Sequence, residues 1–318
     1  MSEEILRVEG AKKHYEVKKT FGEDKLVKAL DGVSFSLQRQ KTLAIVGESG
    51  CGKSTLAKFL MQIETPTAGN YSINGRDVKE LPKKEFLQQI QMIFQDPYSS
   101  INPRKKAWQI IAEPLFVNTD LPRSECRNKA IEMMEVVGLR PELADRFPHM
   151  FSGGQRQRIG IARALILHPK ILICDEPVSA LDVSIQAQVI NLMIDLQDDL
   201  GVSYLFISHD LSVVKHIADQ ILVMYLGKVV EYGDYDKVFS NPQHPYTQAL
   251  LASTPQVSTD QHGFQAISGE LPSPLDPPSG CAFHKRCPHS TPECETQVPE
   301  LVDFQGRKAA CHHLGNLK

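Results

Sequence analysis

The sequence predicts an α/β fold with a parallel core sheet, and three features of its pattern lead to this prediction. Apolar runs of strand length alternate with segments of helical pattern, which is typical of parallel strands covered by helices on both faces. Short strand-like segments separated by turn residues come first in the chain and predict an N-terminal antiparallel β layer. A long stretch without strand-like runs lies between two of the apolar runs, and it predicts a helical subdomain inserted into the core.

The antiparallel layer is predicted from short segments with turn residues between them. Asn74-Gly75 is a strong hairpin signal, and Asp31-Gly32 is predicted to be a second turn. The lysine-rich stretch Val17–Lys28 is predicted to be a loop. The predicted strands are Leu6–Val8, Val33–Leu37 and Tyr71–Ile73.

The parallel sheet is predicted from apolar runs that helical patterns follow. The helix after the first run is expected over Leu56–Met61, and residues 97–164 are expected to be helical, for example over Cys126–Val137. Composition changes near Ser253, where proline and glycine become frequent, so residues 1–253 and 254–318 are predicted to be separate parts. The predicted parallel strands are Leu43–Val46, Gln91–Phe94, Ile171–Cys174 and Tyr204–Ile207.

Composition limits the classes of function. With 42% hydrophobic and 23% charged residues, the chain of 318 residues has an ordinary globular balance. The net charge of −3 gives no basic excess, so nucleic acid is not indicated as a partner. No apolar run approaches the roughly 18 residues of a membrane helix, and the N-terminus has no signal-peptide pattern. We therefore expect a soluble protein that reaches a membrane only through partners.

A phosphate-binding loop is the most specific motif. Gly47–Thr55 fits the pattern G-x-x-x-x-G-K-[ST] directly after an apolar strand and before a helical run. The alternative, a chance glycine-rich turn, is disfavoured by this context. Backbone N–H groups and the helix N-terminus would hold the phosphates of ATP, Lys53 would reach the β- and γ-phosphates, and Ser54 would bind Mg²⁺. The nucleotide-binding residues predicted in the loop are Gly47, Ser49, Gly50, Cys51, Gly52, Lys53, Ser54 and Thr55.

Two adjacent carboxylates end a later apolar strand. In Ile171–Glu176 the strand finishes with Asp175 and Glu176. Neighbouring side chains of a strand point to opposite faces, so the two can divide their roles. Asp175 suits Mg²⁺, and Glu176 suits a general base for the attacking water. Alone, the pair would be read as solvated carboxylates, but a phosphate loop in the same chain favours the catalytic interpretation.

A third motif resembles a known family. Phe151–Arg158, with the sequence FSGGQRQR, resembles the signature motif of ABC-type ATPases, and the resemblance covers residues 1–253. It implies that Gln95 senses Mg²⁺ and the γ-phosphate, that His209 contacts the γ-phosphate, and that Tyr15 stacks on adenine. It also implies that Ser179 to Asp182 form the D-loop, with Ser179 and Asp182 at its ends. A glutamine, histidine or tyrosine at such a place is usually a packing or solvated residue, so the joint order and spacing carry these assignments.

The resemblance also implies a dimer. In this family the signature residues complete the ATP site of a second subunit, because they cannot reach the phosphate held by their own chain. This sequence contains one phosphate loop, so we expect a second chain, a homologous ATPase subunit. The signature residues expected to face the partner's ATP are Ser152, Gly153, Gly154 and Gln155.

The C-terminal part narrows the family. His244–Leu251, Gly269–Pro272 and Gly280–Phe283 resemble the tail of the oligopeptide/dipeptide importer ATPases. This implies two transmembrane permease subunits, an extracytoplasmic solute-binding protein, and a place at the cytoplasmic face of the bacterial inner membrane. Nickel, antimicrobial peptides or oligosaccharides stay open as alternative substrates. A DNA- or ribosome-directed ABC ATPase and a nucleotide-holding module without hydrolysis are the alternatives outside transport.

Four cysteines close the sequence with the spacing C-x5-C-x6-C-x16-C: Cys281, Cys287, Cys294 and Cys311. Four thiolates can hold one [4Fe–4S] cluster or one Zn²⁺ ion, and metal-free packing is the third possibility. The resemblance favours the cluster, in a structural role. The basic residues Lys285, Arg286 and His289 are expected to surround this anionic centre, and His312 and His313 are possible substitute ligands.

Overall fold

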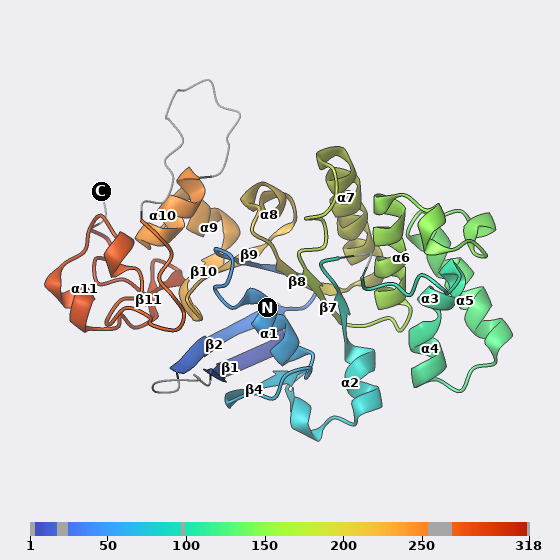
Figure 1. Ribbon diagram of the computed structural model, residues 1–318, viewed down its shortest axis with the longest axis horizontal. Coiled ribbons are helices and arrows are strands. Elements are labelled where there is room, and N and C mark those ends of the chain that lie inside the picture. The colour runs from blue at the N-terminus through green and yellow to red at the C-terminus, as the bar shows by residue number, and fades with distance from the viewer. Residues whose placement is uncertain (1–3, 18–24, 97–98, 254–268, 317–318) are drawn as a thin grey trace. The chain divides into compact units, whose positions relative to one another are not determined.

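The computed structural model describes residues 4–17, 25–96, 99–253 and 269–316 (Figure 1). These residues fall into two units, and each is described by itself. The first unit contains Leu37–Thr42 and Ile73–Ile207, together with the start of the first strand. The second contains Leu6–Ser36, Leu43–Ser72 and Ser208–Lys318. Residues 254–268 lie outside the described residues, so the predicted boundary near Ser253 stays a prediction.

Three parallel strands form the sheet of the first unit, in the order β8-β7-β6. Every residue of β7 and β8 is buried, which explains why these strands appear in the sequence as continuous apolar runs. The predicted strands of this region are confirmed to within one or two residues. Their bounds are Ile90–Ile93 (β6), Ile171–Asp175 (β7) and Ser203–Ile207 (β8).

Helices make up most of the rest of the first unit. Within 97–164, the described residues form helices and 3₁₀ turns joined by loops, without a strand, and the separate subdomain stays a prediction. Residues 97 and 98 lie outside the described residues. The helix expected from Cys126 begins at Arg123, directly after Pro122, because proline suits the start of a helix. The bounds are Lys83–Gln89 (α2), Ala107–Ile111 (α3), Glu113–Asn118 (α4), Arg123–Val136 (α5), Gly153–Leu165 (α6) and Val183–Leu200 (α7), with β5 at Arg76–Asp77 and 3₁₀ turns at Val78–Glu80, Pro141–Leu143 and Pro148–Met150.

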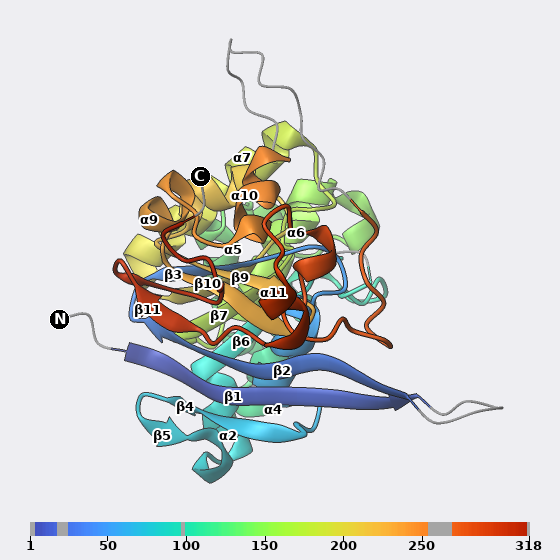
Figure 2. The ribbon, with the colours of Figure 1, turned by 90° about the vertical axis from the view of Figure 1, so that its left-hand side faces the viewer.

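Long antiparallel strands open the second unit, in the order β2-β1-β4 (Figure 2). They are longer than predicted, and the prediction of a turn at Asp31-Gly32 is wrong, because both residues lie inside β2. Lys25–Lys28 also belongs to β2 and not to a loop, whereas residues 18–24 lie outside the described residues. Inter-strand pairing here overrides local turn signals. The bounds are Glu4–Val17 (β1), Lys25–Gln38 (β2) and Ala68–Ile73 (β4).

The second sheet of this unit is mixed, which corrects the purely parallel prediction. β3 pairs with β9 in parallel, whereas β9 and β10, β10 and β12, and β12 and β11 pair antiparallel. Leu226 and Gly227 both have positive φ, 42° and 78°, as a two-residue hairpin turn requires, and this turn reverses the chain between β9 and β10. The bounds are Thr42–Val46 (β3), Gln220–Tyr225 (β9), Lys228–Asp234 (β10), Val302–Phe304 (β11) and Arg307–Ala309 (β12).

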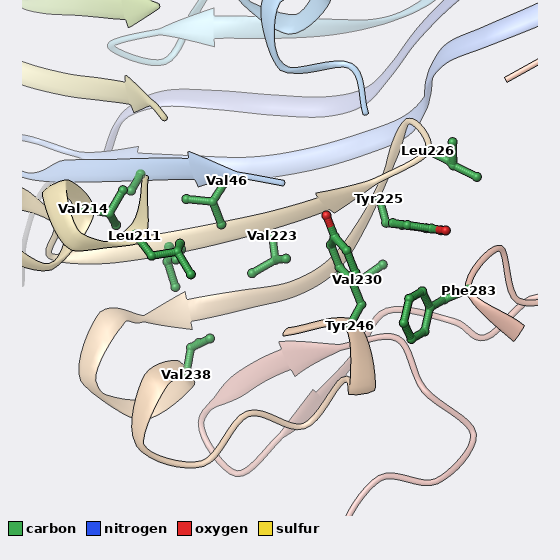
Figure 3. Packing of buried hydrophobic residues seen from close by; sticks show 12 residues of the cluster. Val46, Leu211, Val214, Val223, Tyr225, Leu226, Val230, Val238, Tyr246 and Phe283 are labelled. Atoms are coloured by element: carbon green, nitrogen blue, oxygen red, sulfur yellow. The ribbon is translucent and has the colours of Figure 1, made fainter. Parts of the chain in front are cut away.

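One apolar cluster joins the helices of the second unit to this sheet (Figure 3). Tyr246 of α10 packs against Tyr225 of β9 with ring centroids 4.6 Å apart, and Phe283 lies edge-on to Tyr225 at 5.3 Å. The part of the chain that carries the four C-terminal cysteines, residues 269–316, is called the cysteine segment, and it shares this core with β9 and α10. The helices are Lys53–Leu60 (α1), Leu211–Ile217 (α8), Tyr235–Ser240 (α9), Pro245–Ala252 (α10) and Pro292–Thr296 (α11), with a 3₁₀ turn at His284–Arg286.

Each helix in the described part of the chain is too short or too polar to cross a bilayer.

A buried carboxylate anchors the C-terminal strands. Glu231 of β10 is fully buried, and its oxygens accept hydrogen bonds from the backbone N–H groups of Gln243 and His244 at 2.9 and 3.1 Å. Arg307 of β12 lies 3.7 Å from the same carboxylate and donates to the carbonyl of Asn241 at 2.6 Å. Burial raises the pKa of Glu231, so the cation and the donors are needed to keep it charged.

Arg307→Met is expected to destabilise the pairing of β10 with β12. Removing one partner leaves a buried charge uncompensated, at a cost of about 3 kcal/mol. Native-state hydrogen exchange would show faster exchange of the backbone N–H groups of β12. Lys308→Met, at an exposed neighbouring position, is the matched control, and equal exchange in the two variants would contradict the assignment.

Candidate functional site

The phosphate loop lies in the second unit, between β3 and α1. Gly47 has φ of 153° and Gly52 has φ of 111°, which side-chain-bearing residues rarely adopt. A Cβ atom at Gly47 would collide with the carbonyl oxygen of Met224, and one at Gly52 with that of Ala29. Both positions therefore require glycine for conformation and for space. The loop is a tight connection that ends at the N-terminus of α1.

Lys53 is folded into the loop. Its side chain is buried, and its Nζ donates to the carbonyl oxygens of Gly47 at 2.7 Å and of Glu48 at 3.1 Å. The ammonium group thus occupies the centre of the loop and bonds neutral carbonyls. An anion placed there would add charge–charge attraction to the hydrogen bond. This arrangement can bind phosphate.

Tyr15 lies beside the start of α1. It is partly buried, and the Nζ of Lys13 sits 4.9 Å from the centre of its ring. Burial raises the pKa of Tyr15, its hydrogen bond with Glu64 raises it further, and its hydrogen bond with Thr55 lowers it. The contact with Thr55, the last residue of the predicted nucleotide-binding set, brings the ring to the end of the phosphate loop.

His209 belongs to the same unit and is exposed just before α8. The next residue, Asp210, caps that helix by accepting a hydrogen bond from the backbone N–H of Ser212 at 2.8 Å. Ser208 donates its backbone N–H to Ile45 of β3 at 3.2 Å. His209 is therefore held between two anchored neighbours, near the strand that leads into the phosphate loop.

The two carboxylates predicted to serve Mg²⁺ binding and catalysis lie in the first unit, at the end of β7. Asp175 is buried, and Glu176 has a positive φ of 48°. The backbone N–H of Glu176 bonds the carbonyl of Ile207 at 3.0 Å, and its Oε2 accepts a hydrogen bond from Nε2 of Gln95 at 2.8 Å. The structure thus brings together two predicted site residues that are 81 positions apart in the chain.

The signature motif starts α6 with a capping box. The Ser152 hydroxyl accepts from the backbone N–H of Gln155 at 3.3 Å, and the Gln155 side chain accepts from the backbone N–H of Ser152 at 3.0 Å. A Cβ atom at Gly154 would strike Ile185 of α7. Ser152, Gly154 and Gln155 all line one cavity of about 300 Å³, so the motif borders a space that can receive a ligand.

The predicted D-loop follows Glu176 directly. Ser179 is exposed and donates its hydroxyl to the carbonyl of Glu176 at 3.1 Å. Asp182 occupies the N-cap of α7 without a capping hydrogen bond from its side chain. The hydrogen bond from Ser179 thereby connects the predicted D-loop to Glu176, the residue with positive φ.

The four C-terminal cysteines line one small cavity together with His284, His312 and His313. The Cys294 Sγ lies 3.5 Å from Nε2 of His313, and the backbone N–H of Cys281 bonds the carbonyl of Cys294 at 2.8 Å. Within the ranges that the structure describes, no group of three or more His, Cys, Asp or Glu side chains is placed to hold a metal ion. The donor set of a four-thiolate site is gathered here, but not its ligand geometry.

Burial raises the pKa of three of these thiols and keeps them protonated. It raises the pKa of Cys281 and of Cys287, and it raises the pKa of Cys311 to about 11. The neighbouring thiols add to the shift, because each disfavours a second negative charge in the same cavity. A bound cation would reverse this balance, since metals bind thiolates.

Two contacts to the phosphate loop were not predicted. Arg286 was expected to surround an anionic centre at the cysteines, but its guanidinium instead pairs with Glu48 of the loop. The hydroxyl of Tyr246 accepts a hydrogen bond from the backbone N–H of Glu48 at 2.7 Å. No local sequence pattern predicts either contact, because the partners lie about 200 or more residues apart in the chain.

Two family models match the chain. The model described as "ABC transporter" matches residues 30–179, and the one described as "Oligopeptide/dipeptide transporter, C-terminal region" matches residues 230–294. The "Dipeptide transport ATP-binding protein DppF" of Escherichia coli is 57% identical over 98% of this chain and 95% of its own length. The "Di/tripeptide transport ATP-binding protein DppF" of Pseudomonas aeruginosa is 55% identical over 98% of both chains.

Solved structures agree with these matches. The ATP-binding cassette MJ0796, in a dimeric post-hydrolysis state bound to ADP and Pi, has a TM-score of 0.63 and 26% identity. The match covers 72% of this chain and 98% of the MJ0796 chain. CbiO1 from Clostridium perfringens, described as part of the ABC transporter complex cbiONQ, has a TM-score of 0.64 and 29% identity over 75% of this chain and 92% of its own.

Glu176→Gly is expected to be more stable than Glu176→Ala by about 1 kcal/mol. A side-chain-bearing residue at positive φ costs about 1–2 kcal/mol, and glycine avoids most of that cost. Both variants lose the side chain beyond Cβ and the hydrogen bond with Gln95, so their difference reports mainly the backbone strain. Chemical denaturation of the two variants under identical conditions would measure it, and a less stable glycine variant would show that residue 176 is not strained.

Proposed function

The chain belongs to the ATP-binding subunits of the oligopeptide/dipeptide ABC transporter family, and from this premise we propose that it hydrolyses ATP to drive uptake of di- and oligopeptides. The relatives that it matches along nearly its whole length are transport ATP-binding proteins for dipeptides, tripeptides and oligopeptides. The observation that carries the proposal is the phosphate loop with Lys53 at its centre, in a chain that also holds Glu176 against Gln95.

Binding of ATP begins at the loop. The β- and γ-phosphates replace the carbonyls of Gly47 and Glu48 as partners of Lys53, because a phosphate adds charge–charge attraction to the hydrogen bond from the ammonium group. Ser54 in the loop and Asp175 at the end of β7 are each predicted to bind Mg²⁺, and a bound Mg²⁺ would neutralise the charge of the phosphates. Tyr15, beside Thr55, stacks on the adenine.

Hydrolysis then requires a positioned water. Glu176 accepts its proton as general base, and the hydrogen bond from Gln95 holds the carboxylate in place. His209 donates to the γ-phosphate. The positive φ of Glu176 aims its side chain away from the line of the strand, which is a reason for a strained residue at this position.

The signature motif acts on a second subunit. Ser152 and the first backbone N–H groups of α6, from Gly153 and Gly154 to Gln155, bind the γ-phosphate held by the partner, and Ser179 and Asp182 face the same interface. The solved MJ0796 cassette is described as dimeric in its post-hydrolysis state, which supports this arrangement. We propose a homologous heterodimer, in which ATP bridges the two subunits and loss of the phosphate lets them separate.

Import requires further partners. We propose two transmembrane permease subunits, an extracytoplasmic solute-binding protein and a position at the cytoplasmic face of the bacterial inner membrane. Another small solute, such as nickel, an antimicrobial peptide or an oligosaccharide, is the alternative cargo. For a non-transport ABC ATPase acting on nucleic acid, binding would have to be tight and to weaken steeply with salt.

The four cysteines are proposed to hold a [4Fe–4S] cluster, with Zn²⁺ as the alternative. The support is the donor set, since four thiols from separate segments of the chain line one cavity. When bound, the group would link these segments through metal–thiolate bonds and would have a structural role. Cys281, Cys287, Cys294 and Cys311 would each bind it as a thiolate.

Glu176→Gln is expected to lower ATP turnover by about 100-fold or more, because general-base catalysis contributes 10²–10⁴. ATP affinity should be retained, since the phosphate loop is unchanged. The measurement is phosphate release by the complex with its membrane partners, together with uptake of a labelled dipeptide. Glu132→Gln on the exposed face of α5 is the matched control, and normal turnover with uptake in Glu176→Gln would refute the role.

Anaerobically purified protein is expected to be brown, with about four irons and four sulfides per chain. Cys287→Ser should lose most of this iron, whereas Cys126→Ala, outside the cysteine segment, should keep it. Visible absorption with iron, sulfide and zinc analysis measures both. A zinc content of one with no iron would select the alternative, and a metal-free protein would leave the cysteines as packing residues.

A further inference from the structure

A bidentate ion pair links the cysteine segment to the phosphate loop within the second unit. The Nη1 of Arg286 lies 2.7 Å from Oε2 of Glu48, and Nη2 lies 3.0 Å from Oε1. The side chain of Arg286 is 4% exposed, and that of Glu48 is 25% exposed. Paired, planar contacts of this kind are stronger and more directional than those of an ordinary surface ion pair.

The arginine is held rigidly by its surroundings. Its backbone N–H bonds the carbonyl of Phe283 at 2.9 Å, and Nη1 also lies 3.4 Å from the hydroxyl of Tyr225. Its guanidinium lies 5.9 Å from the ring centre of Phe283 and 6.0 Å from that of Tyr225. These two rings and Tyr246 pack on one another (Figure 3). The guanidinium therefore projects from an ordered aromatic core.

The same core fixes the backbone of Glu48. The backbone N–H of this residue donates to the hydroxyl of Tyr246, whose ring belongs to the cluster that supports Arg286. Both the side chain and the main chain of Glu48 thus depend on the region after residue 240. Glu48 follows Gly47 directly, and its carbonyl is one of the two that Lys53 bonds.

The charge of Glu48 is unfavourable for the loop's ligand. A carboxylate in a loop that receives a polyphosphate repels it, because both carry negative charge. Arg286 cancels this charge and draws the carboxylate towards the aromatic core. We infer that Arg286 is a positioning residue for ATP: the cysteine segment neutralises Glu48 and thereby completes the phosphate-binding loop.

The inference rests on the proposed nucleotide role of the loop, and the experiment separates the two. Equilibrium binding of ATP and of ADP is measured with the full chain by calorimetry. Arg286→Gln is expected to bind ATP about tenfold more weakly, the loss that about 1.4 kcal/mol implies. ADP should lose less, because it has less charge to be repelled. Lys285→Gln removes one positive charge from an exposed neighbour and should bind as the unaltered chain does.

The decisive variant removes both charges. In Glu48→Gln/Arg286→Gln the contact is lost but the carboxylate is gone as well, so ATP affinity should return to within about twofold of the unaltered chain. A purely structural role of Arg286 predicts no such recovery. Glu48→Gln alone, with Arg286 still in place, should bind ATP at least as tightly as the unaltered chain, and this test holds even if Arg286→Gln fails to fold.

Each outcome supports or overturns the inference. The inference is overturned if Arg286→Gln binds ATP as tightly as Lys285→Gln, or if the double variant binds ATP as weakly as Arg286→Gln. A loss of ATP affinity in Glu48→Gln would also overturn it. Lys53→Ala is measured in parallel and should abolish ATP binding. If Lys53→Ala also binds normally, the loop itself is not the phosphate site and the proposed function fails. If only Lys53→Ala loses binding, the inference about Arg286 alone fails.

Discussion

The close packing of backbone around the phosphate loop is the constraint on which the nucleotide site depends. Gly47 meets the carbonyl of Met224 and Gly52 meets that of Ala29, so neither position has room for a side chain. The loop is therefore pressed against β2 and against the end of β9. This fixes the direction in which α1 starts and places Lys53 at the centre of the loop, where its ammonium group bonds two loop carbonyls. Anything that moves β9 also moves the loop.

The C-terminal region is the second support of this loop. Tyr225 is the last residue of β9, and it packs with Tyr246 of α10 and with Phe283 of the cysteine segment. Through Tyr246 and Arg286 the same cluster bonds Glu48. The cysteine segment is thus not an appendage to the nucleotide-binding part of the second unit. The hydrophobic core and the bidentate pair hold this segment against the phosphate loop. The proposed cluster, by stabilising the segment, would also support the loop.

In the first unit, charged and polar groups are held at the ends of helices and strands. Glu176 sits at positive φ directly after a fully buried strand, and Gln95 bonds its carboxylate. Ser152 and Gln155 cap the start of α6 reciprocally, and Gly154 allows α7 to pass close by. In both places polar residues lie at the end of a helix or strand that packs in the core. The core therefore fixes the positions of these polar residues.

The sequence by itself determined the motifs, the buried parallel strands and the family, because these depend on local spacing and on burial of apolar runs. Gln95 and Glu176 were each predicted at the end of a strand, but the pairing of those strands and the hydrogen bond between the two residues came from the structure. The length of β2, the antiparallel turn after β9 and the partner of Arg286 were decided only by tertiary structure. β2 continues through Asp31-Gly32 because strand pairing outweighs a turn signal. Arg286 reaches Glu48 because an aromatic core, assembled from three distant segments, aims it away from the cysteines.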